Sequence, residues 1–176
     1  NDIELVINND LYCLDVWSKQ WLLKFNPLKT KAILFSIRKN LQFPCLRFQD
    51  CDLEFMSNHK HLGITFSHDL GWTTYIDTIL SNAYKKLGLL KKLKYKVSRK
   101  TLSLLFTTFI RPQLEYASEV WSGCLNYDSE KLEKLQLTAA RIVTGLTSLA
   151  SRDSLYLETG WETLSDRRLH KLKTTM

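Results

Sequence analysis

Closely spaced carboxylates are the first groups in this chain that could do chemistry, because paired carboxylates can hold the two metal ions of an in-line displacement. The one Asp-x-Asp pair is Asp50 and Asp52. Both lie in the polar run Gln49–Asp52, which is typical of a β-turn, where aspartate bonds to nearby backbone. Between residues 31 and 66 the only further carboxylate is Glu54. The pair is therefore predicted to shape a turn and to hold no metal.

Thiols and imidazoles are the second set of candidate ligands. They are Cys13, Cys45, Cys51, Cys124, His59, His61, His68 and His170. No two cysteines have the C-x-x-C spacing of metal and redox motifs. A zinc site drawn from Cys45, Cys51, His59 and His61 is the alternative, but structural zinc loops bring their ligands in close pairs. We therefore predict buried, reduced thiols, no metal, and an intracellular setting, nuclear or cytoplasmic.

Basic side chains are concentrated in residues 78–114, which contain nine lysines and arginines and no acid. The net charge of the whole chain is +7, so this stretch carries more than the entire excess. Its members are Lys85, Lys86, Lys91, Lys92, Lys94, Lys96, Arg99, Lys100 and Arg111. A positive face of this kind gains free energy on meeting phosphates by releasing their counterions. The alternative is a solvated helix face that binds nothing.

The composition bounds the class of protein. With 176 residues and 44% apolar content, the chain can form one domain or two small pieces of a larger one. No apolar run approaches the roughly 20 residues that cross a bilayer, so no membrane association is expected. Because it starts without a methionine or a signal peptide, the chain is expected to be a piece cut from a longer protein.

The elements that must position these groups begin with a helix. Apolar residues at helical spacing predict it over residues 10–23, with Trp17 and Trp21 buried and Pro27 ending it. Four β-prone runs follow, and we expect them to form one small antiparallel sheet. They are Lys31–Ile37, Cys45–Phe48, Leu53–Phe55 and His61–Phe66.

After Gly71 the apolar residues recur every three or four positions, which predicts an all-helical region. The apolar stripe of its first helix is Trp72, Tyr75, Ile76, Ile79, Leu80, Ala83, Leu87, Leu90 and Leu93. The expected caps and breaks of the later helices are Ser98, Pro112, Asp128 or Ser129, Gly145, Ser151 and Ser165. The predicted fold class is α+β, a small antiparallel sheet with one helix followed by a helical bundle.

Several motifs occur together and in order. They are W-x3-W-x3-FN-x2-KT at residues 17–30, HKHLGITF at 59–66, DLGW at 69–72, RPQLEYASEVW at 111–121, LEKLQLTAARIVTG at 132–145 and LYLETGWETLSDRR at 155–168. In this order they resemble the reverse transcriptase, an RNA-directed DNA polymerase, of LINE-type, Jockey-like non-LTR retrotransposons. The likeness covers nearly the whole chain.

The resemblance implies a division into polymerase parts. Residues 1–66 would be the C-terminal part of the palm, 67–122 the helical thumb and 123–176 a helical connector, with the chain truncated at both ends. The family's catalytic aspartate pair would lie in a missing upstream polymerase segment, together with the Mg²⁺ that the intact enzyme needs. The fragment alone is expected to hold no cofactor and not to polymerise.

The resemblance also gives roles to single residues. Lys29 matches the lysine of the FN-x2-KT element, which implies a proton donor to pyrophosphate or a phosphate contact. The alternative is that Lys29 is an ordinary surface lysine. The family's primer-gripping hairpin falls on His61, Leu62 and Gly63, and Lys60 would be a phosphate contact beside it. The alternative is that these residues only form a turn and pack locally. The family often has Tyr where this chain has His61, which weakens that assignment.

The basic residues would then belong to a thumb that holds an RNA/DNA template-primer without reading its sequence. The proposed phosphate contacts are Lys60, Lys85, Lys86, Lys91, Lys92, Lys94, Lys96, Arg99 and Lys100. Two alternatives stay open. One is a non-catalytic module that binds nucleic acid or a protein partner, and the other is a decayed copy of a retrotransposon without function.

Overall fold

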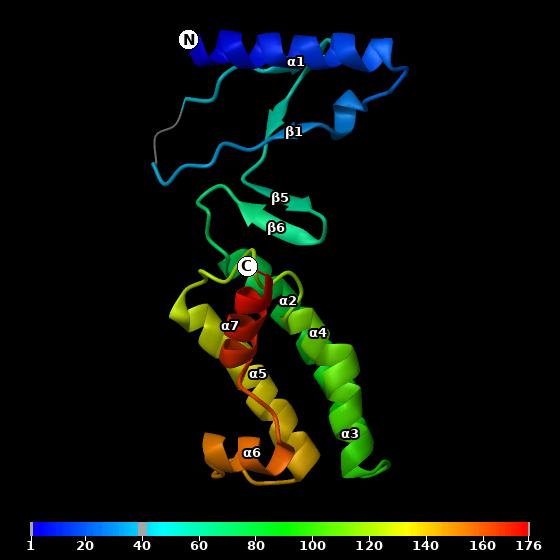
Figure 1. Cartoon of the computed structure of the whole chain (residues 1–176), viewed down its shortest axis with the longest axis vertical. Coiled ribbons are helices and arrows are strands. Elements are labelled where there is room, and N and C mark those ends of the chain that lie inside the picture. The colour runs from blue at the N-terminus through cyan, green and yellow to red at the C-terminus, as the bar shows by residue number, and fades with distance from the viewer. Residues whose placement is uncertain (1, 39–41, 176) are drawn as a thin grey trace. The chain divides into compact units, whose positions relative to one another are not determined.

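The computed structural model describes residues 2–38 and 42–175 (Figure 1). Residues 1 and 176, the outer bounds of the predicted palm and connector, lie outside this description. The chain divides into two units, residues 1–71 and 72–176. The first carries one helix and short strands, and the second is helical, so the predicted α+β class is confirmed. The finer division into palm, thumb and connector stays a prediction.

The first unit opens with helix α1, Asp2–Gln20, which begins earlier than the predicted helix. The one-turn 3-10 helix η1, Pro27–Lys29, follows it. The prediction of two core tryptophans is wrong, since Trp17 is 45% and Trp21 67% exposed. The helix instead buries Asp15, whose carboxylate accepts a hydrogen bond from the Gln49 amide at 2.6 Å. The spacing of apolar residues predicted the helix but not which of its faces would be buried. The strands beside the helix are too short to cover its apolar face.

The strands of the first unit form three two-stranded sheets rather than one antiparallel sheet. The pairs are β1 Lys31–Ala32 with β4 Glu54–Phe55, β2 Arg47–Phe48 with β3 Cys51–Asp52, and β5 Asn58–His61 with β6 Ile64–Ser67. The last two pairs are antiparallel hairpins, whereas β1 and β4 are parallel. Hairpins pair neighbours in sequence, but a parallel pair needs a crossover that local β-propensity does not reveal.

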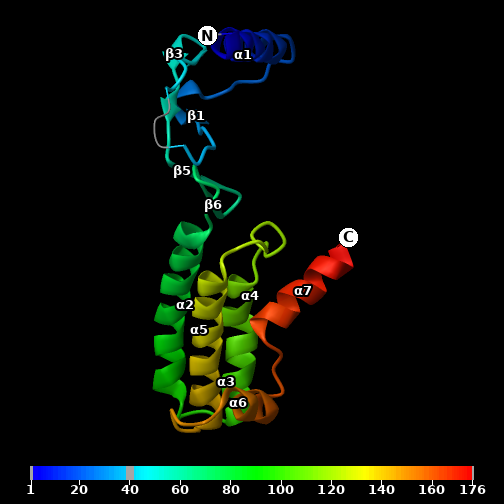
Figure 2. The same ribbon diagram turned by 90° about the vertical axis from the view of Figure 1, so that its left-hand side faces the viewer.

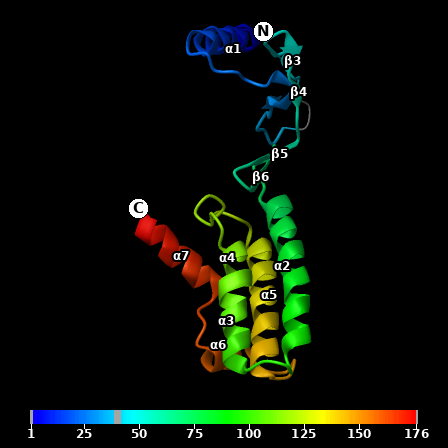
Figure 3. The same cartoon turned by 90° about the vertical axis from the view of Figure 1, so that its right-hand side faces the viewer.

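The second unit is a helical bundle, as predicted (Figure 2). Its elements are α2 Thr73–Leu93, α3 Arg99–Leu105, the π-helical turn η2 Phe106–Ile110, α4 Arg111–Leu114, α5 Asn126–Thr144, α6 Arg152–Thr159 and α7 Leu164–Thr175. Figure 3 shows α5 running between α2 and the α3–α4 segment. Because α5 has neighbours on several sides, it buries residues around most of its circumference. They are Asp128, Leu132, Glu133, Leu135, Gln136, Leu137, Ala139, Ala140, Ile142 and Val143.

Several helix ends follow the sequence signals. The Ser98 and Ser151 hydroxyls accept hydrogen bonds from the Thr101 and Ser154 amides, both at 3.1 Å, as N-caps do. Gly145 ends α5 with a φ of 77°, in the left-handed conformation expected of it. These three signals are confirmed.

Other ends differ from the prediction. Asp128 does not cap α5, which begins at Asn126, but is fully buried and accepts a hydrogen bond from the Thr73 hydroxyl at 2.7 Å. Its carboxylate therefore joins the start of α2 to α5. Near Ser165, the cap of α7 is the preceding Thr163, whose hydroxyl accepts from the Asp166 amide at 3.0 Å.

Candidate nucleic-acid interface

The basic stretch follows the outer end of α2 and the turn into α3. Six of its nine members gather there, at the lower end of the bundle in Figure 3. Lys91 and Lys92 lie in the last turn of α2, Lys94 and Lys96 in the connecting turn, and Arg99 and Lys100 at the start of α3. Lys85 and Lys86 lie earlier on α2.

These side chains are almost free of acidic partners. Within the described part of the chain, the one member of the stretch in an ion pair is Arg99, whose guanidinium lies 2.7 Å from the Glu158 carboxylate. The Lys86 ammonium donates to the backbone carbonyl of Phe109 at 3.4 Å, and that of Lys94 lies 5.4 Å from the Tyr95 ring centre. Apart from Arg99, the positive charge of these side chains is therefore not neutralised by ion pairs within the described part of the chain.

Arg111 is separate from the other eight. It is 8% exposed, and its guanidinium carbon lies 5.5 Å from the Phe106 ring centre and 5.0 Å from that of Trp161. Burial lowers the pKa of this guanidinium from its ordinary value. Arg111 was counted in the basic stretch but not among the proposed phosphate contacts, and its environment makes it part of the aromatic core.

The hairpin β5–β6 carries the predicted primer-grip residues. Its turn is formed by Leu62 and Gly63, with φ values of 47° and 86°. Two positive φ values in a two-residue loop are characteristic of a type I′ turn, in which glycine is favoured. His61 pairs with Ile64 across the hairpin, and Lys60 and His61 are both exposed on β5. The hairpin thus presents these side chains, while contact with a primer stays a prediction.

Lys29 is the last residue of η1 and is exposed. The backbone carbonyl of Asn26 accepts hydrogen bonds from the amides of Lys29 at 3.0 Å and Thr30 at 3.2 Å. Asn26 therefore shapes the turn around Pro27. A substrate role for Lys29 stays a prediction.

Of the carboxylate pair, Asp50 lies in a turn, as expected, whereas Asp52 lies in strand β3. Asp50 has a φ of 63° in the tight turn between β2 and β3, and the Asp52 carboxylate lies 3.0 Å from the Arg47 guanidinium. Across the described residues, no three His, Cys, Asp or Glu side chains come close enough together to hold a metal ion.

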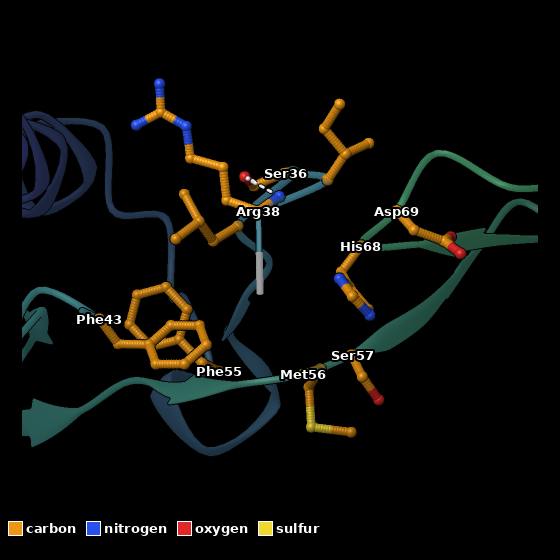
Figure 4. Close-up of a pocket in the computed structure, with 10 residues that line it drawn as sticks. Ser36, Arg38, Phe43, Phe55, Met56, Ser57, His68 and Asp69 are labelled. Atoms are coloured by element: carbon orange, nitrogen blue, oxygen red, sulfur yellow. Dashed lines mark hydrogen bonds between the residues drawn. The ribbon is translucent and has the colours of Figure 1, made fainter. Parts of the chain in front are cut away.

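A pocket in the first unit was not found from the sequence (Figure 4). Its volume is about 570 Å³. Phe43 and Phe55 form one side, with ring centres 4.9 Å apart, while His68 and Asp69 lie on another. Ser36 closes it by donating its amide to the His68 carbonyl at 2.8 Å. Of these residues only Asp69 belongs to a motif, DLGW, and that motif does not indicate a pocket, so only the fold brings the lining together.

No described helix is both long enough and apolar enough to cross a bilayer. The ordered motifs of this chain resemble those of reverse transcriptases. No protein-family model matches the chain, and no solved structure does.

Two curated relatives make the relationship specific. The chain is 22% identical over 161 residues to a probable RNA-directed DNA polymerase from transposon BS of Drosophila melanogaster, a match that covers 89% of this chain and 18% of the relative. It is 19% identical over 165 residues to a probable RNA-directed DNA polymerase from transposon X-element of the same organism, covering 91% of this chain and again 18% of the relative. The resemblance to LINE-type reverse transcriptases is thereby confirmed. The chain spans less than a fifth of the length of either relative.

Proposed function

We propose that this chain holds an RNA/DNA template-primer duplex as part of a longer retrotransposon reverse transcriptase. The observation that carries the proposal is the cluster of basic side chains around the α2–α3 turn, with one acidic partner among its described members. Lysines on such a surface bind backbone phosphates and are indifferent to base sequence. The contacts are Lys85, Lys86, Lys91, Lys92, Lys94, Lys96, Arg99 and Lys100.

The hairpin and Lys29 complete the proposal. The hairpin could lie against a primer backbone, because Lys60 and His61 are exposed beside the tight turn at Gly63. Exposed Lys29 suits a phosphate contact. Asp52 is paired with Arg47, which leaves it poorly suited to hold the Mg²⁺ of polymerisation. We assign that metal, and catalysis, to other parts of the longer protein, so this chain alone would not polymerise.

The test is binding of the purified chain to a labelled RNA/DNA primer-template over a series of salt concentrations. We expect the affinity to fall steeply as salt rises, because each phosphate contact releases counterions. Replacing Lys85, Lys91, Lys92 and Lys100 by glutamine should lower the affinity. It should also reduce the slope of log K against log salt by about 0.9 for each phosphate that the variant no longer neutralises.

The charge-matched comparison sets a double variant, Lys91→Gln with Lys92→Gln, against a control that replaces Lys134 and Lys173, exposed lysines on α5 and α7, by glutamine. The control changes net charge without touching the proposed surface and should leave the slope close to that of the wild type. An affinity that does not depend on salt, or an equal loss in both variants, would contradict the proposal. The chain would then retain the family's fold without this part of its activity.

A further inference from the structure

A small apolar groove lies between α2 and the π-helical turn η2. Its volume is about 270 Å³. It is lined by Lys86, Leu89, Leu90, Leu93, Leu105, Phe109 and Ile110. Leu90 and Ile110, each 3% exposed, form the floor, whereas Leu89 at 61% and Phe109 at 64% stand as open walls. Two large exposed apolar side chains facing one hollow mark a binding surface, since leaving them in water costs free energy.

The groove has room for two side chains of a partner. An engineered protein cavity of about 150 Å³ takes up benzene, so a hollow nearly twice that size can accept two leucine- or phenylalanine-sized groups. It is also preformed. The Lys86 ammonium donates to the Phe109 carbonyl at 3.4 Å and links the α2 wall to the η2 wall.

Exposed positive charge lies along one side of the groove. Lys85 and Lys92 lie four residues before and three residues after Leu89, so on a helix they flank it on the same side of α2. Both are exposed. The opposite wall, from α3 to η2, carries no exposed charge next to Phe109, because its neighbours are Thr108 and Ile110 and the next cation, Arg111, is buried.

The occupant must therefore combine two apolar side chains with acidic groups along one edge. A nucleic-acid backbone has the negative charge but offers no apolar side chains to fill the groove. A short amphipathic helix with apolar residues four positions apart supplies both, and helix-in-groove binding is a common mode of recognition.

We propose that this groove binds a short acidic amphipathic helix of a partner protein, with two apolar side chains inserted and its carboxylates facing Lys85 and Lys92. The proposal does not depend on duplex binding. Since the two ligands would share these lysines, the helix and the duplex would compete for the chain.

The probe is an acetylated, amidated, alanine-based helical peptide with Leu and Phe four residues apart and glutamates on the adjoining edge. Fluorescence anisotropy should show binding to the full chain. Phe109→Ala and Leu89→Ala should each weaken it by about tenfold, which is about 1.4 kcal/mol. Both side chains are mostly exposed, so the variants should fold. Leu104→Ala is the control, since Leu104 is 60% exposed on α3 and outside the groove.

Peptides with lysine in place of glutamate, or alanine in place of Leu and Phe, should bind much more weakly. Affinity for the peptide that is unchanged in Phe109→Ala and Leu89→Ala would overturn the proposal. The proposal would also be overturned if binding of single-stranded DNA, or self-association of the chain, depended on Phe109 as strongly as peptide binding does. The groove would then bind a base or a second copy of the chain. Neither alanine variant removes charge, so the salt dependence of duplex binding should stay unchanged, which keeps the two proposals separable.

Discussion

At the scale of single residues, burial sets what a charged group does in this protein. Glu133 is only 6% exposed on α5. Its carboxylate accepts a hydrogen bond from the Leu164 amide at 3.0 Å, at the start of α7, and another from the Tyr156 hydroxyl. Burial nevertheless raises the pKa of this carboxyl above its ordinary value. A residue that reads as one more surface glutamate of a helix thus ties α6 and α7 to α5.

The raised pKa of Glu133 gives a prediction about pH. The folded state holds the proton more tightly than the unfolded chain, so the stability from Glu133 is complete at acid pH and is lost as pH rises through the folded pKa. Glu133→Gln has no charge to bury and keeps an acceptor for the Leu164 amide. We expect it to reduce the fall of the unfolding free energy as pH rises above the ordinary range of a glutamate carboxyl, measured by urea titration at several pH values. Asp153→Asn, which removes an exposed carboxylate of α6, is the control. Equal pH dependence in wild type and Glu133→Gln would refute this account.

At the scale of elements, the signals read correctly from the sequence are those whose partners are close in the chain. The Ser98 and Ser151 caps bond three residues ahead, and Gly145 bonds four residues back, so local spacing identified them. Asp128 was misread as a cap because its partner, Thr73, is 55 residues away. The same limit applies to the pairing of β1 with β4 and to the pocket of Figure 4. The basic cluster of the candidate interface was found because it is continuous in sequence.

Two glycines provide a matched pair of predictions for the helices. Gly145 has a φ of 77° and open space around its Cα, so Gly145→Ala meets backbone strain alone and should destabilise by about 1 kcal/mol. Gly88 lies inside α2, also with open space, so Gly88→Ala should stabilise by about 1 kcal/mol. Thermal and urea unfolding of both variants would test the pair. Changes of the same sign would contradict it.

At the scale of the whole molecule, the two units differ in how many buried apolar side chains each contains. Of the buried apolar side chains in the described residues, only Leu46, Phe48 and Ile64 belong to the first unit. The first unit also leaves large apolar side chains in water, among them Trp17 of α1 and Trp21 in the turn after it. The motif order, which spans both units, revealed the relationship to polymerases. It could not reveal this imbalance, because burial depends on what is packed nearby.

The imbalance predicts separate behaviour of the two units. Residues 72–176 expressed alone should give a dispersed NMR spectrum and a cooperative melt, because their buried side chains pack on one another. Residues 1–71 alone should lack a cooperative transition, since a few buried side chains cannot offset the loss of chain entropy. A cooperative melt of the isolated first unit, or none for the second, would show that the core is divided differently.

The π-helical turn η2 has a consequence for the helical phase of the bundle. Leu102, Phe106, Ile110 and Leu114 are all buried and recur every four residues. On a regular α-helix such a repeat drifts by about 40° at each step and would carry Leu114 away from the core. The wider turn at Phe106–Ile110 takes up that drift, because it holds an extra residue. Insertions and deletions in this segment are therefore not equivalent. Loss of one residue between Phe106 and Ile110 would bring back a plain α-helix and leave Arg111 and Leu114 close to their present phase, whereas an added residue would rotate them by about 100° away from α5 and α7.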